Sequence, residues 1–166
     1  EQVIEALLTV ADEAIKNFVD MREVEGERLL KDVLSRADTI LSKVALVEER
    51  SPETVKAYRE RLEQKVRDLL ETANIDEQRI ITETAIFADK IAVDEETVRL
   101  RSHIKQLESF LNAEGPAGKK LDFIVQEMNR ETNTIGSKAQ DVDIARRVID
   151  IKAEVEKIRE QIQNIE

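Results

Sequence analysis

Apolar residues recur along this chain at the three- and four-residue spacings of amphipathic helices. One such pattern covers residues 1–49 and includes Gly26, which weakens a helix by about 1 kcal/mol without ending it. Ser51 and Pro52 then favour a new helix start, because serine caps helices and proline suits the first helical position. We therefore expect a second helix over 53–72, antiparallel to the first, in a long hairpin that projects from the rest of the chain.

The remaining residues predict four shorter helices. Aspartates that can cap a helix precede three of them: Asp76 before a helix to about residue 90, Asp94 before a helix over 95–113, and Asp141 before a helix over 142–165. The remaining helix, over 119–135, follows the break at Gly115 and Pro116 and ends at Gly136. The last helix has a strict heptad of β-branched residues, which is typical of a coiled-coil seam. Because one short partner helix cannot cover this stripe, we expect the chain to form a homo-oligomer.

These patterns predict an all-α protein in which residues 1–75 form the helical hairpin, or arm, and residues 76–166 form a C-terminal helical domain. Composition agrees, since 37% of residues are charged and only 3% are aromatic, which excludes an all-β sandwich. No apolar run approaches the roughly 18–20 residues of a membrane span, and the acidic amphipathic pattern of the first residues leads us to expect no signal peptide. We expect a cytoplasmic protein without a membrane partner. The missing initiator methionine indicates a fragment of a longer polypeptide.

The net charge of −10 argues against binding of nucleic acid by bulk electrostatics, so a phosphate site has to be a local basic patch. Lys119 and Lys120 follow the Gly-Pro-Ala-Gly loop, near a helix N-terminus whose N–H groups favour anions. They are either a phosphate contact or two solvated lysines.

The helix expected over 119–135 is unusually polar. Glu127 and Glu131 are four residues apart and therefore neighbours on one face, where like charges destabilise a helix by a few tenths of a kcal/mol. An adjacent stripe consists of Asp122, Gln126, Asn129 and Asn133. Carboxylates beside carboxamides suit a divalent cation, which prefers oxygen ligands, or a reacting proton. The alternative is a solvated face on which Arg130 neutralises both glutamates.

His103 is the only histidine, and it shares a stripe of its helix with Glu96 and Arg99. Its unperturbed pKa near 6.5 suits a general acid or base, and imidazole also ligates metals. The alternative is a histidine at the border of the core, hydrogen-bonded to Glu96 or to a backbone carbonyl. The chain contains no phosphate-binding loop, nucleophile elbow or zinc pattern.

Three separated blocks of the chain closely resemble the signature of the bacterial YicC-like family, also called YloC. They are Glu95–His103, Gly118–Ala139 and Lys157–Glu166, with a weaker match at Met21–Gly26. The resemblance covers the whole chain and implies an endoribonuclease that acts on RNA with a divalent metal and assembles as a homohexamer. It also implies a further N-terminal domain that is missing here. Thr132 departs from the family, which more often has alanine there.

The resemblance indicates that the polar positions matter, and side-chain chemistry suggests their roles. We assign metal binding or proton transfer to Glu127, Glu131 and Asp122. His103 is assigned the role of a general acid, a general base or a metal ligand. Phosphate contacts are assigned to Lys119, Lys120, Arg130, Lys138 and Arg99, with support from Glu96, Gln126, Asn129 and Asn133. The expected cofactor is Mn²⁺ or Mg²⁺ and the expected substrate is RNA. The alternatives are a non-catalytic RNA-binding adaptor and a structural oligomerisation module.

Overall fold

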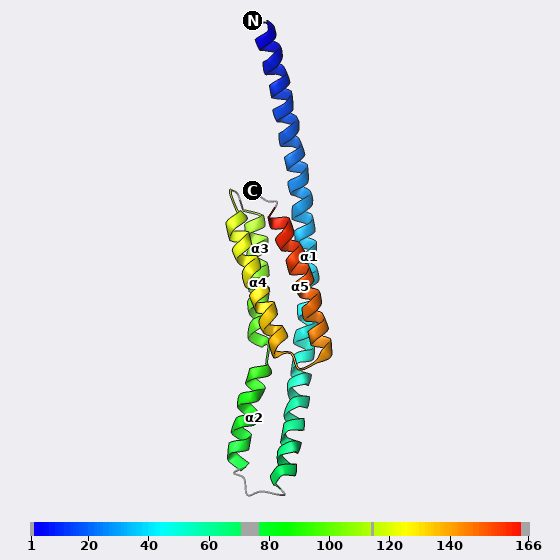
Figure 1. Cartoon of the computed structure of the whole chain (residues 1–166), viewed down its shortest axis with the longest axis vertical. Helices are drawn as coiled ribbons and strands as arrows, with labels where there is room; N and C mark the ends of the chain where they lie inside the picture. The colour runs from blue at the N-terminus through cyan, green and yellow to red at the C-terminus, as the bar shows by residue number, and fades with distance from the viewer. Residues whose placement is uncertain (1, 71–76, 114, 164–166) are drawn as a thin grey trace.

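The computed structural model describes residues 2–70, 77–113 and 115–163, and every element in these ranges is an α-helix. The helices are α1 (Gln2–Leu70), α2 (Glu77–Ile91), α3 (Asp94–Leu111), α4 (Gly118–Lys138) and α5 (Val142–Ile162). Helix α1 runs the length of the molecule, and the other four pack beside its C-terminal part (Figure 1). The all-α prediction is confirmed. No helix in these ranges is long and apolar enough to cross a membrane.

The predicted turn at Ser51 and Pro52 is wrong, because α1 continues through Pro52 to Leu70. Proline removes one helical hydrogen bond and its ring crowds the carbonyl four residues earlier, at a cost of about 3 kcal/mol. Contacts with other helices hold both sides of this position. Ser51 is buried, and Glu48 accepts hydrogen bonds of 2.8 and 2.6 Å from Arg101 on α3. Tertiary packing therefore overrides the local stop signal.

The antiparallel partner of the end of α1 is instead α2, which lies alongside it (Figure 1). Tyr58 on α1 stacks on Phe87 of α2 with ring centroids 4.8 Å apart. The expected cap Asp76 lies outside the described residues. The division of the chain into an arm, 1–75, and a C-terminal domain, 76–166, stays a prediction, although residues 33–47 of α1 share a core with α3, α4 and α5.

The heptad prediction for α5 is confirmed in its pattern, but the stripe is covered within one chain. The buried members are Ile144, Val148, Ile151, Val155, Ile158 and Ile162, whose exposed fractions are 0 to 5%. They pack against α1 on one side and α4 on the other. Asp141 caps α5 as predicted, since its side chain accepts from the backbone N–H groups of Asp143 and Ile144. As far as Ile162, the stripe consequently leaves no apolar surface for a second copy, and its last predicted member, Ile165, lies outside the described residues.

Two other predicted helix ends differ from the structure. Asp94 is the first residue of α3 and not its cap, because the cap position is taken by Val93. Helix α4 continues through Gly136 to Lys138. A Cβ atom on Gly136 would lie 3.0 Å from Cγ1 of Val148, so this glycine allows α4 and α5 to approach closely. The predicted break at Gly115, by contrast, is confirmed, with φ of 92° between α3 and α4.

Candidate functional site

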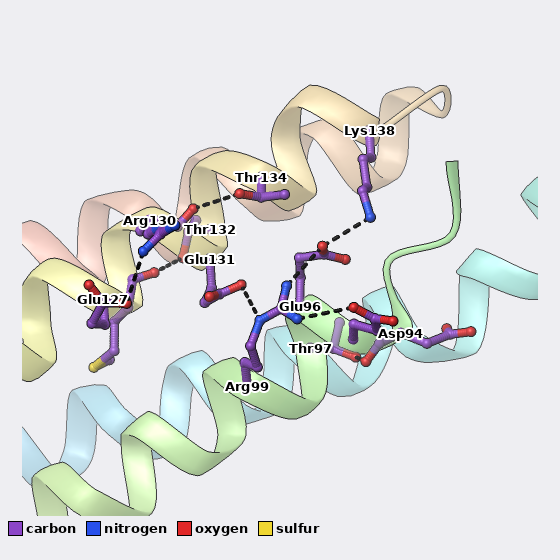
Figure 2. A network of polar contacts seen from close by, with 12 residues as sticks. Asp94, Glu96, Thr97, Arg99, Glu127, Arg130, Glu131, Thr132, Thr134 and Lys138 are labelled. Atoms are coloured by element: carbon purple, nitrogen blue, oxygen red, sulfur yellow. Dashed lines mark hydrogen bonds and ion pairs between the residues drawn. The ribbon is translucent and has the colours of Figure 1, made fainter. Parts of the chain in front are cut away.

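The candidate site lies where α3 and α4 pack side by side in opposite directions (Figures 1 and 2). The inner faces of both helices are apolar, with Leu100, Ile104 and Leu107 of α3 in the core together with Leu121, Ile124 and Met128 of α4. The polar residues stand along the border of that apolar seam. The helical spacing thus places charged groups in a partly buried position between two rigid elements.

His103 of α3 meets Glu127 and Glu131 of α4 in one cluster. Each residue has a possible ligand atom, and these atoms all lie within 4.8 Å of one another. Glu131 is buried and the other two are half-buried. The Nδ1 atom of His103 is buried without a hydrogen-bond partner in the part of the chain that the structure describes. The prediction that both glutamates share one face is therefore confirmed, and the histidine stands opposite them.

Each glutamate of the cluster also contacts an arginine. Nε of Arg99 lies 2.9 Å from Oε2 of Glu131, and the Glu131 side chain is only 8% exposed. Arg130 approaches Glu127 more loosely, at 3.6 Å, and its own side chain is 75% exposed (Figure 2). The two arginines offset the repulsion between the carboxylates, which solves the like-charge problem that the sequence poses.

Arg99 is itself held by a second buried carboxylate. Oε1 of Glu96 accepts from Arg99 at 3.0 Å and from Lys138 at 2.9 Å, while its Oε2 is buried and has no partner among the described residues. Burial alone would raise the pKa of the Glu96 carboxyl. The hydrogen bonds from Lys138 and from its own backbone, with the charges of Lys138 and Arg99, bring that pKa below its ordinary value. Glu96 therefore stays ionised and anchors both cations.

Lys138 closes this network at the end of α4. Its Nζ atom donates to Glu96 (Figure 2) and also to the carbonyl of Ala92 at 3.1 Å. Lys138 and Arg99 were expected to contact phosphate, and the structure places both in intramolecular ion pairs. Their phosphate roles stay predictions.

The other predicted residues lie outside the cluster. Asp122 accepts from Gln126 at 2.7 Å, and Asn133 donates to Asn129 at 3.2 Å, each along the same side of α4. Lys119 and Lys120 are exposed, and Nζ of Lys120 lies 5.6 Å above the ring of Phe110. Thr132 is buried and donates to the carbonyl of Met128, so the departure from the family pattern is accommodated.

A shallow groove of about 630 Å³ lies along α4 beside the cluster. Gln126, Asn129, Arg130 and Asn133 line it, together with Arg159 of α5. Sequence analysis did not single out Arg159. Its signal was its position inside the family block 157–166, but only the packing of α5 on α4 brings it to the polar face.

Comparisons with known proteins show what the chain is similar to. Residues 47–166 match the family described as "Endoribonuclease YicC-like, C-terminal". The chain is 44% identical over 168 residues to a probable endoribonuclease YicC of Clostridioides difficile (strain 630). It is 38% identical over 166 residues to the protein of that name from Haemophilus influenzae (strain ATCC 51907 / DSM 11121 / KW20 / Rd).

Both alignments include 100% of this chain and 57% of the relative, so the chain spans a little over half the length of these curated relatives. The matched region contains the cluster and the ion pairs that hold it. The chain therefore belongs to the YicC-like endoribonuclease family.

Proposed function

We propose that this chain carries the catalytic site of a metal-assisted endoribonuclease, which cleaves phosphodiester bonds of RNA. The observation that carries the proposal is the cluster of His103, Glu127 and Glu131. The names of the two relatives support the reaction class, since each is called a probable endoribonuclease.

The donor set of the cluster fits a divalent cation. Buried polar atoms nearly always have partners, so the orphaned Nδ1 of His103 indicates that a group is missing from its surroundings. Carboxylates suit Mg²⁺ and Mn²⁺, and one imidazole beside them favours Mn²⁺. Three protein ligands also leave coordination positions for water and a phosphate oxygen. A bound cation would supply charge stabilisation at the phosphate and an activated water.

The surrounding residues would position the ligands and the substrate. Arg99 fixes the carboxylate of Glu131, and Glu96 with Lys138 fixes Arg99, so the buried ligand is oriented before any cation binds. Arg130 is exposed at the rim and is the cation best placed to contact an incoming phosphate. If it is not a ligand, His103 is the group in the cluster that could act as a general acid or base.

We also propose that the protein is cytoplasmic and that it assembles as a homohexamer, as the resemblance implies. The covered stripe of α5 does not support this assembly. An exposed apolar stripe lies on the N-terminal part of α1, where every side chain from residue 2 to residue 28 is exposed. Sedimentation at tens of micromolar tests the assembly, and a monodisperse monomer contradicts it for this chain.

The site is tested by Glu127→Gln and Glu131→Gln, measured for this chain and for a full-length relative with the same substitutions. Each variant should lose at least about a hundredfold in metal-dependent cleavage of a structured RNA while keeping the fold, because it removes one metal ligand. Glu108→Gln on α3 is the control, since Glu108 lies outside the cluster. Cleavage is compared in Mn²⁺, in Mg²⁺ and with a chelator.

Asp122→Asn separates the predicted ligand from the observed cluster. If the cluster is the site, this variant should keep most of its activity, because Asp122 contacts Gln126 instead. If both glutamine variants cleave RNA as fast as the wild-type protein does, the proposed metal site is wrong. RNA binding without cleavage by the wild-type full-length protein favours the adaptor function, and assembly without RNA binding favours the structural module.

A further inference from the structure

The groove along α4 differs in charge from the rest of the molecule. The whole chain carries a net charge of −10, yet the described side chains that line this groove include no carboxylate and two arginines, Arg130 and Arg159. The other polar lining groups are carboxamides and hydroxyls. A local surface of this kind is the basic patch that an acidic protein needs in order to bind a polyanion.

The carboxamides follow one face of α4 in a continuous row. Gln126, Asn129 and Asn133 are three and four residues apart, so they stand one above another along the helix. Nδ2 of Asn133 donates to Oδ1 of Asn129 at 3.2 Å, which uses one donor and one acceptor of the pair. This hydrogen bond does not use the amide N–H groups of Asn129 or the carbonyl oxygen of Asn133, which are the groups that we expect to contact a ligand.

These residue types are not explained by the helix itself. Asparagine, threonine and serine are all poorer helix formers than alanine, and Asn129, Asn133, Thr134 and Ser137 stand in the interior or last turn of α4. None of them caps the start of α4. The groove face therefore lowers the stability of the helix that carries it, which is expected where side chains are kept for binding.

The groove is continuous with the cluster through Arg130. This residue lines the groove and also lies 3.6 Å from Glu127, one of the three possible metal ligands. An RNA phosphate bound by Arg130 would stand at the edge of the cluster. The nucleotides on one side of that phosphate would then follow α4 toward Ser137 and Arg159.

We propose that this groove binds the single-stranded segment of RNA next to the phosphodiester bond that is cleaved. Arg130 and Arg159 contact phosphates, and the carboxamides of Asn129 and Asn133 contact base edges, which are accessible in unpaired RNA. This inference rests on the proposed function, because it names the part of the substrate that the same site holds.

The test compares Arg159→Ala with Arg146→Ala. Both arginines are exposed residues of α5 with an acidic residue three positions earlier, but Arg146 does not line the groove. Affinity for a fluorescent single-stranded oligoribonucleotide is measured by anisotropy in chelator, so that no cleavage occurs. Arg159→Ala should weaken binding about five- to tenfold and reduce the salt slope by about one, whereas Arg146→Ala should change affinity less than twofold.

Asn133→Ala gives a second readout that a change in charge or folding cannot produce. It should alter the order of affinities for oligo-A, oligo-U and oligo-C while leaving the salt slope unchanged. The reason is that the variant loses a contact with a base edge but keeps every contact with a phosphate. Melting curves by circular dichroism confirm that each variant is folded.

The outcomes separate this inference from the proposed function. If Arg159→Ala binds the oligoribonucleotide as tightly as the wild type does, the proposal that the groove binds RNA is wrong, even if the wild-type protein cleaves RNA in a metal-dependent way. Retained cleavage by the glutamine variants overturns the metal site and leaves the groove to be judged on binding alone. If Arg159→Ala changes the sedimenting mass but not RNA affinity, the groove is an interface between copies and the proposal is wrong.

Discussion

Two segments of the same helix have the same hydrophobic pattern and opposite surroundings. In residues 33–47 of α1, the five apolar residues of the stripe are 0 or 1% exposed, whereas Leu7, Leu8 and Ile15 are all more than 60% exposed. The difference is α5, which packs along the first segment and not the second. Apolar periodicity therefore specifies a helix and its face, but it does not say which partner covers that face.

The charges of the two segments differ in the same way. Along the covered segment, Arg36 binds Glu154 and Lys43 binds Asp150, each at 2.9 Å across to α5. Along the exposed segment, the contacts are local, such as the hydroxyl of Thr9 on the carbonyl of Glu5 and Arg22 above the ring of Phe18. Cross-helix ion pairs fix the register of α1 on α5 and leave the exposed segment without such a constraint.

The largest expected difference is in amide hydrogen exchange. In the monomer, residues 33–47 should open only with the whole bundle, at about 5–15 kcal/mol, whereas residues 2–28 should open at nearly no cost because an isolated helix is marginal in water. Exchange measured by mass spectrometry on peptides from each segment tests this. Equal protection would show that the exposed stripe is covered in solution.

A smaller difference is expected from truncating one apolar side chain in each segment. Ile40→Ala should lower the free energy of unfolding by about 2–5 kcal/mol, since Ile40 is fully buried. In the monomer, Leu8→Ala should change it by less than about 0.5 kcal/mol, since Leu8 is 61% exposed. Urea unfolding followed by circular dichroism gives both values. A loss above 1 kcal/mol for Leu8→Ala would mean that a partner covers the stripe.

The smallest difference concerns the ion pairs and depends on pH. A hydrogen bond from Lys157 and one from Arg36 hold the pKa of Glu154 below its ordinary value, against its partial burial. A lowered pKa means that the carboxylate stabilises the fold above the unfolded pKa of about 4.3, and that this stability is lost as pH falls through the folded value. Arg36→Met should therefore lower the free energy of unfolding by about 1 kcal/mol at pH 7. The loss should become progressively smaller as the pH falls below about 4.3, because Glu154 then becomes protonated.

Lys16→Met in the exposed segment is the control for this measurement. It should change stability by less than about 0.5 kcal/mol at every pH, because Lys16 is exposed on a segment without cross-helix contacts. Melting temperatures between pH 7 and pH 3 give the comparison. A constant cost of Arg36→Met across that range would show that the arginine acts by packing and not by charge.

Periodicity and spacing were sufficient for most of the fold and for the centre of the site. The four-residue interval places Glu127 and Glu131 on one face whatever the tertiary structure is, and His103 is conspicuous as the only histidine of the chain. Pro52 and Gly136 could not be interpreted locally, because their signals are overridden by contacts with residues more than ten positions away. Local residue preferences describe the isolated helix, and here packing decides.

The ion-pair partners of the site residues could not be predicted from the sequence either. Arg99 and Lys138 have the charge that a phosphate contact requires, but their distances to Glu131 and Glu96 depend on how α3 and α4 align. Arg159 reaches the polar face of α4 only through the packing of α5. Chemistry can be assigned from residue type, whereas the pairing of groups needs the relative placement of helices.

The uncovered part of α1 is also a mechanical element. Residues 2–28 form a helical rod about 40 Å long that is anchored at one end by the bundle. Long helices bend smoothly with radii of about 60–100 Å, and such curvature displaces the free tip by about 10 Å without breaking a hydrogen bond. A partner that docks on this rod is therefore attached through an element that bends elastically. The distance between the partner and the bundle depends on the bending stiffness of the helix as well as on the contacts that the partner makes.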